Sequence, residues 1–189
     1  MKFENAQKLL DKYVKGQTLK RHCLTVAITL EFFAKDFKAQ NPQVWKSAGL
    51  LHDIDFELYP DEHCIKAKEI LESEKANFPD LTDEIIRAVL SHGWNLTNAV
   101  EPQTDLEKTL YAVDELTGLI FACAMVRPSK SVVDLEVKSA LKKFKSAGFA
   151  ANCNRDVINA GAAMLGMDLK TLMQKTILAM RSGHELIGV

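Results

Sequence analysis

The chain has no long apolar run, no excess of charge of one sign and no closely spaced pair of cysteines. A membrane-spanning helix needs about 18 or more consecutive apolar residues, and the sequence contains no such run. The charged, amphipathic N-terminal segment also lacks the apolar stretch of a secretory signal. We therefore expect a cytoplasmic protein that does not act in a membrane.

The charges balance almost completely, with 24 Lys and Arg against 25 Asp and Glu and a formal net charge of −1. No global positive field is available to attract a polymeric nucleic acid, so we expect none as a partner. Four widely spaced cysteines in a chain without a signal segment favour reduced, buried thiols over disulfides. These are Cys23, Cys64, Cys123 and Cys153.

Apolar residues recur at steps of three and four along nearly the whole chain, which is typical of amphipathic helices. No alternating strand pattern, internal repeat or low-complexity tract interrupts them. The sequence predicts an all-α fold in which residues 1–189 form one domain, with a core over about 18–124. The C-terminal helical extension, about 125–189, could form a second lobe. The expected helices cover about 19–37, 42–51, 61–75, 82–92, 104–124, 155–165 and 169–181.

Capping signals support several of these boundaries. Asn41 before Pro42 is typical of an N-cap followed by proline at the first helical position. Thr104 with Glu107 three residues later has the spacing of a capping box. Gly166 suits the end of one C-terminal helix, and Asp168 suits the cap of the next.

Histidines are few, and four of the five lie on or beside helical segments. His52 is followed directly by Asp53, at the point where the apolar pattern stops. Adjacent residues of a helix point about 100° apart, so this pair can share a ligand only near a helix end. We interpret His184, near the C-terminus, as a surface residue. The other three histidines are His22, His63 and His92.

A further carboxylate, Asp114, lies within an apolar stretch. An ionised Asp near a core would cost several kcal/mol if it were buried without a partner, and a cation beside it would remove that cost. Imidazoles together with carboxylates suit divalent iron, manganese or zinc, whereas a set of carboxylates alone would suggest magnesium or calcium. The pattern therefore favours a transition-metal site.

The order His22, His52-Asp53 and Asp114 resembles the signature of the HD-domain superfamily of metal-dependent phosphohydrolases. Paired leucines precede the His-Asp pair, as they do in that family, and the similarity extends from about residue 18 to residue 124. The resemblance implies a compact multi-helix bundle and a metal ion bound by these four side chains.

Two further positions are similar to the binuclear members of this family. His63 occupies a similar position at a helix start, and His92 resembles their later histidine. The resemblance implies that Asp53 bridges two ions, the second of which also binds His63 and His92. One or two divalent ions are thus expected, with iron or manganese favoured and zinc, nickel or magnesium left open.

The activity implied by this resemblance is hydrolysis of a nucleotide or another small phosphorylated metabolite. A metal lowers the pKa of bound water and neutralises phosphoryl oxygens. Asp53 and Asp55 are then the candidate catalytic residues, and Asp55 or Glu57 could hold a proton or contact a side chain that binds the metal. Many relatives have Gly-Lys after the His-Asp pair, where this chain has Asp55-Phe56, so it departs from the cyclic-dinucleotide branch. Residues 116–189 resemble an uncharacterised branch of predicted hydrolases.

Basic residues of the C-terminal extension are candidates for phosphate binding. Lys138 and Lys142 are four residues apart and would share a helix face. Arg127 and Arg155 could join them, since a guanidinium can donate two hydrogen bonds to one phosphate. The alternative interpretation of the lysines is a solvated helix face.

Two other functions stay open at this point. A non-catalytic module could bind a metal and a nucleotide without turnover, and some di-iron relatives of the family are oxygenases. The sequence does not identify the substrate, the native metal or the oligomeric state, a homodimer included.

Overall fold

Ten α-helices and one 3₁₀ turn build the fold in the computed structural model, which describes residues 1–189. The structure has no β-strand, and only an isolated bridge joins Trp94 and Asn98. The predicted all-α class is therefore confirmed. The helices are α1 (Phe3–Tyr13), α2 (Gln17–Asp36), α3 (Pro42–Leu51), α4 (Ile65–Glu74), α5 (Asp83–Ser91), α6 (Asp105–Met125), α7 (Val137–Phe144), α8 (Arg155–Met164), α9 (Leu169–Ser182) and α10 (His184–Ile187).

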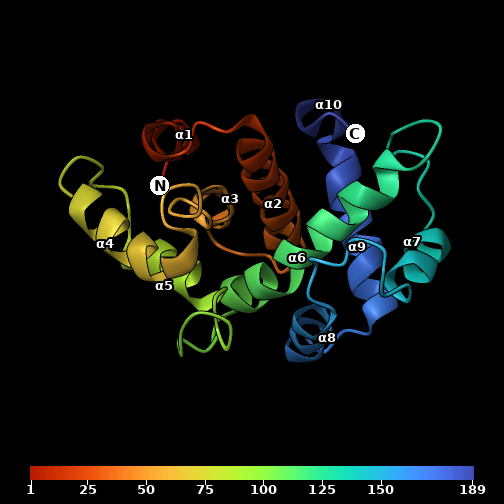
Figure 1. Ribbon diagram of the computed structural model, residues 1–189. Coiled ribbons are helices and arrows are strands. Elements are labelled where there is room, and N and C mark those ends of the chain that lie inside the picture. Colours follow the sequence, from red (N-terminus) through yellow and green to blue (C-terminus); the bar gives the residue numbers. More distant parts are fainter.

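The two longest helices, α2 and α6, pack against each other in the middle of the molecule (Figure 1). Helix α3 packs along α2, and α1 and α5 both contact α3. On the other side, α8 packs on α6, and α9 contacts α2, α6 and α7. The α2–α6 crossing thus lies between the N-terminal helices and the C-terminal extension.

Two glycines permit the closest helix approaches. A Cβ atom at Gly49 of α3 would lie 2.8 Å from Cα of Ala27 in α2. A Cβ atom at Gly161 of α8 would lie 2.5 Å from Cα of Ala112 in α6. Real Cβ atoms do not approach backbone this closely, so only glycine allows α3 and α8 to pack at these distances. The first approach brings the end of α3 next to α2.

The predicted caps are present. The side chain of Asn41 accepts a hydrogen bond from Gln43 N, with Pro42 at the first helical position. Thr104 Oγ1 accepts from Glu107 N at 3.3 Å, and Asp168 Oδ1 accepts from Thr171 N at 2.7 Å. These side chains satisfy amide groups that have no partner within their own helix.

The helix predicted over 61–75 is wrong at its start. Residues Pro60–Glu62 form a 3₁₀ turn, Cys64 has a φ of 66°, and α4 begins only at Ile65. Asp55 Oδ2 accepts a hydrogen bond from Ala67 N in the first turn of α4, at 2.8 Å. A carboxylate distant in sequence therefore caps α4, so the chain before α4 can leave the helical path.

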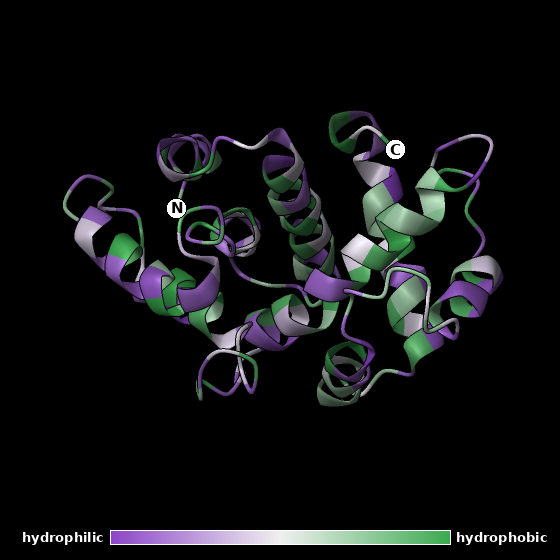
Figure 2. Cartoon of the chain, in the orientation of Figure 1, coloured by the Kyte–Doolittle hydropathy of each residue, from purple (hydrophilic) through white to green (hydrophobic).

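One cluster of 47 buried hydrophobic residues extends through the structure from Met1 to Val189. The hydrophobic faces of the helices point inward and their polar faces outward (Figure 2), as the periodicity predicts. The four cysteines are unpaired, and all but Cys153 are fully buried. None of the helices combines the length and the apolar character that crossing a bilayer would require.

Candidate metal centre

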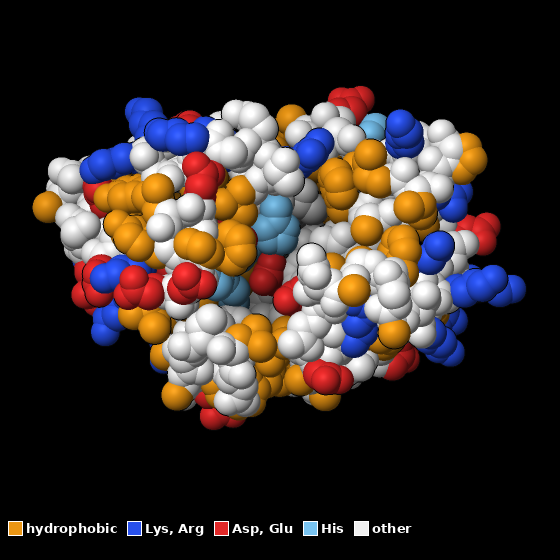
Figure 3. Space-filling model, viewed as in Figure 1, with side chains coloured by type: hydrophobic (Ala, Val, Ile, Leu, Met, Phe, Trp, Pro, Cys, Tyr) orange, Lys and Arg blue, Asp and Glu red, His pale blue; other side chains and the backbone are white.

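Histidine and carboxylate side chains gather in a hollow at the middle of the face shown in Figure 3. The hollow is a cavity of about 230 Å³ whose walls come from α2, α6, α8 and the two segments that join α3 to α4 and α5 to α6. Its polar lining residues are His22, Asp53, His63, His92, Thr97, Asp114 and Glu115.

The first half of the centre consists of His22, His52 and Asp114. His22 lies on α2, Asp114 lies on α6, and His52 follows the last residue of α3. The Nε2 atom of His22 is 2.9 Å from Asp114 Oδ1 and 3.1 Å from His52 Nε2. Atom Nε2 of His52 is 3.3 Å from Asp114 Oδ1. The three side chains therefore enclose one small volume.

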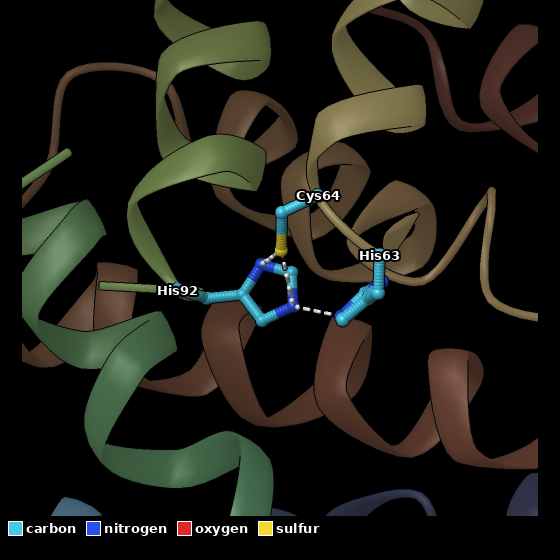
Figure 4. Close-up of side chains that lie close together, drawn as sticks. All are labelled: His63, Cys64 and His92. Carbon is cyan, nitrogen blue, oxygen red and sulfur yellow. Dashed lines mark hydrogen bonds between the residues drawn. The ribbon is translucent and has the colours of Figure 1, made fainter. Parts of the chain in front are cut away.

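The second half consists of His63, Cys64 and His92 (Figure 4). His63 and Cys64 lie in the turn that precedes α4, and His92 follows the last residue of α5. The Nε2 atoms of His63 and His92 are 3.0 Å apart, and Cys64 Sγ lies 3.7 Å from His92 Nε2. This group also brings its donor atoms to one point.

Asp53 lies between the two halves. Its Oδ2 atom is 3.5 Å from His22 Nε2 and 3.3 Å from His52 Nε2. Its Oδ1 atom is 3.4 Å from His63 Nε2 and 3.7 Å from His92 Nε2. Each oxygen of this one carboxylate therefore faces a different half, which is the arrangement that a bridging ligand needs.

The family comparison supports this interpretation. The family model of the HD domain matches residues 19–119, which is more than half of the chain. The chain belongs to the HD domain family. No curated protein and no solved structure matches it significantly. HD domains form a superfamily of metal-dependent phosphohydrolases, and the adjacent His52 and Asp53 lie within the matched residues.

The hydrogen bonds of the HD-domain histidines show that the residues fit a metal ion. The Nδ1 atoms of His52 and His92 donate to the carbonyls of Gly49 and Val89, and Nδ1 of His63 lies 2.8 Å from Asp55 Oδ1. A neutral ring that is protonated on Nδ1 has a bare lone pair on Nε2. Two such lone pairs 3.0 Å apart repel, and a cation between the rings removes the repulsion. Imidazole, carboxylate and thiolate donors together suit a divalent transition metal.

The pKa shifts of these groups also favour positive charge at the centre. Burial opposes protonation of His52, but the charges of Asp53 and Asp114 outweigh it and raise the pKa of His52 well above its usual value. Burial likewise disfavours ionisation of Asp53, yet His52 and the neighbouring histidines hold the pKa of Asp53 well below its usual range. The buried carboxylates are therefore ionised and need a compensating cation or protons.

All six residues predicted as metal ligands meet at this centre. His22, His52 and Asp114 form its first half, His63 and His92 contribute to its second half, and Asp53 lies between them. Helix α3 ends at Leu51, so His52 and Asp53 lie just beyond its last residue. Their side chains can therefore face the same site, as expected for adjacent residues near a helix end. Metal ligation itself stays a prediction.

Asp55 and Glu57 do not line the cavity, and the proton-holding role predicted for either of them stays a prediction. Asp55 is fully buried behind His63, and its two oxygens contact His63 Nδ1 and Ala67 N. Glu57 accepts hydrogen bonds from the backbone amides of Lys15 and Gly16, just before α2. Asp55 therefore orients the ring of His63, and Glu57 binds the backbone just before α2.

The four basic residues predicted to bind substrate also lie outside the cavity. Arg127 pairs with Asp134 at 2.8 Å, and the Arg155 guanidinium donates to backbone carbonyls of the loop before α8. Lys138 and Lys142 line a separate surface hollow on α7. Phosphate binding by these residues stays a prediction that their placement outside the cavity does not support.

Three residues close to the centre were not predicted as part of it: Cys23, Cys64 and Glu115. Burial opposes ionisation of Cys64, but His92 and His63 outweigh it and lower the pKa of the thiol to about 6. Burial and the neighbouring charge of Asp114 raise the pKa of Glu115, which lines the cavity, to about 6. The adjacency of each residue to a predicted ligand was the available signal, but only the fold shows that their side chains reach the site.

Proposed function

We propose that this HD domain is a phosphohydrolase that acts on a nucleotide or another small phosphorylated metabolite. The observation that carries the proposal is the position of Asp53, which presents one carboxylate oxygen to each half of the centre. Binuclear sites of this kind suit the in-line displacement of a phosphate ester by water.

The residues that would bind the metal are those of the two halves together with Asp53. A bound divalent ion would supply water of lowered pKa and would neutralise charge on the phosphoryl oxygens. The mixture of imidazole nitrogen, carboxylate oxygen and one thiol favours iron, manganese or zinc over magnesium. Iron or manganese is our first expectation for the native ion.

The chain fixes these side chains before any ligand binds. The Nδ1 contacts of His52, His63 and His92 set both the tautomer and the orientation of each ring. Such preorganisation supports catalysis, because donor atoms need no rearrangement when charge develops on the substrate.

The cavity also indicates the size and character of the substrate. A volume of about 230 Å³ suits a small ligand or one part of a larger one. Phe56 and Leu96 line this cavity and are 45% and 51% exposed. They offer an apolar contact beside the charged centre, which suits the organic part of a phosphorylated metabolite.

The test is a phosphate-release screen over nucleotides and phosphorylated metabolites, with protein loaded separately with iron, manganese, zinc or magnesium. The proposal predicts turnover of one class of compound, dependent on added transition metal and lost in Asp53→Asn. Tight nucleotide binding by metal-loaded protein without turnover would instead support a non-catalytic module. Oxygen consumption during turnover would support an oxygenase.

A further inference from the structure

A second, smaller cavity adjoins the metal centre. It has a volume of about 190 Å³ and lies between α2 and α6. His22 and Gly118 line both cavities, so the two hollows meet at these residues. A ligand at the metal centre could therefore extend into the second cavity.

Arg21 is the one charged side chain, apart from the ring of His22, that lines this second cavity. Its guanidinium lies over the ring of Phe121, 5.0 Å from the ring centroid. Unlike Arg87, which pairs with Glu107, and Arg127, which pairs with Asp134, Arg21 forms no ion pair. An aromatic ring orients the guanidinium by a cation–π contact and leaves its N–H groups free for an anion.

The remaining polar groups of the second cavity are threonine hydroxyls. Thr25 donates to the carbonyl of Arg21 and Thr117 donates to the carbonyl of Asp114, so both of these donors are in use. The hydroxyl of Thr18 has no partner in the structure and can donate to a ligand. No carboxylate lines this cavity, so an anion in it would meet the positive charge of Arg21 without a negative side chain in its walls.

The positions of the lining residues along α6 give the distance between this cavity and the metal centre. Asp114, Gly118 and Phe121 lie four and three residues apart and so share one face of the helix. Seven residues at the helical rise span about 10 Å. Gly118 has no side chain to close the path between the two cavities. Arg21 is thus placed for a group about two helical turns away from the reacting phosphate.

We propose that Arg21, assisted by Thr18, binds a second phosphoryl group of the substrate while the first phosphoryl group lies at the metal centre. This inference rests on the proposed function and narrows the substrate to compounds with two separated phosphoryl groups. Arg21 thus has the phosphate-binding role that the sequence suggested for Lys138, Lys142, Arg127 and Arg155.

The experiment compares hexane bisphosphonate with hexyl phosphonate, two ligands that differ only in the second anionic group. Binding of each to manganese-loaded protein is measured by calorimetry. Wild-type protein should bind the bisphosphonate about tenfold more tightly, which is the effect of one charge-assisted contact. Arg21→Met should remove this preference and leave the metal content unchanged. The control Lys35→Met, which removes an exposed charge from the far end of α2, should retain it.

A second variant tests the path between the cavities. Gly118→Leu should also remove the preference for the bisphosphonate without loss of metal, because its side chain would fill the passage. Equal binding of both ligands by wild-type protein would overturn the inference, as would a full preference in Arg21→Met. Phosphate release is read separately. A preference without turnover would contradict only the proposed function, and turnover without a preference would contradict only the subsite.

Discussion

The two halves of the candidate metal centre differ in how the fold builds them. His22 and Asp114 of the first half lie within long helices, and His52 directly follows α3. In the second half, Cys64 has a φ of 66° in the turn before α4, a backbone conformation that L residues rarely adopt. Regular helices therefore position the first half, whereas an irregular turn positions the second.

The halves also differ in their chemistry and in their supports. A thiol lies close to each half: Cys23 beside His52 and Asp53, and Cys64 beside His63 and His92. Burial raises the pKa of the Cys23 thiol well above its usual value, whereas the neighbouring histidines lower that of Cys64 to about 6, so only the second half offers a thiolate donor near neutral pH. The second half needs Asp55 behind His63, and it needs Gly93, where a Cβ atom would lie 2.6 Å from Cys64 Sγ. We infer that the first half binds its ion more tightly and that the second half is more selective for softer metals.

Asp53→Asn should have the largest effect, because it affects both halves at once. The change removes the negative charge that faces all four histidines, so metal content should fall in both halves. Phosphate release should fall by about 10³-fold or more, since metal ions supply several kcal/mol of transition-state stabilisation. Metal analysis and circular dichroism check the result. The matched change of the exposed Asp61 to Asn should alter neither the metal content nor the rate of phosphate release. An Asp53→Asn protein that keeps its metal and its activity would contradict the bridging role of Asp53.

The double change His63→Ala with His92→Ala separates the halves. It removes the imidazoles of the second half and leaves His22, His52 and Asp114 in place. Metal content should fall by about one equivalent per chain, since the remaining donors still form one site. Elemental analysis measures the loss. An unchanged stoichiometry would mean that the centre holds one ion.

Asp55→Asn should weaken metal binding by the second half and leave metal binding by the first half unchanged. His63 would lose the ionised partner of its Nδ1 atom, and α4 would lose its capping carboxylate. Changes to such supporting residues reduce metal affinity by about 10–100-fold. Metal titration followed by calorimetry should show one weakened binding step and one unchanged step. Equal weakening of both steps would show that the halves do not act separately.

Cys64→Ser should give the smallest effect on metal content and the clearest spectral one. If the thiolate binds the second ion, cobalt-loaded protein will show a near-ultraviolet thiolate-to-cobalt band that Cys64→Ser lacks. The control Cys123→Ser, at a buried cysteine outside the centre, should keep the band. A band that persists in Cys64→Ser would exclude this thiol as its source.

The sequence predicted the first half more completely than the second, because local sequence patterns define the helices that carry the first half. The period of the apolar residues and the Asn41 and Thr104 caps define α2, α3 and α6, and those helices fix His22, His52 and Asp114. The break before α4 depends on Asp55, a partner twelve residues from the amide it caps. Periodicity carries no information about such tertiary contacts, so the place of Cys64 was missed.

The basic residues show the same limit. The spacing of Lys138 and Lys142 correctly indicated a shared helix face, but the packing of α7 on α9 decides where that face points. Arg21 lies beside a predicted ligand, and its importance follows only from the crossing of α2 with α6. Sequence patterns thus predicted the residues that meet at the centre better than the residues around them.

The most direct test of the account is a crystal structure of the manganese-loaded protein with anomalous scattering. The account predicts two anomalous peaks, one beside each oxygen of Asp53, with His22, His52 and Asp114 around the first and His63 and His92 around the second. A single peak would contradict the two-ion centre, and the absence of any peak at Asp53 would contradict the assignment of the metal site.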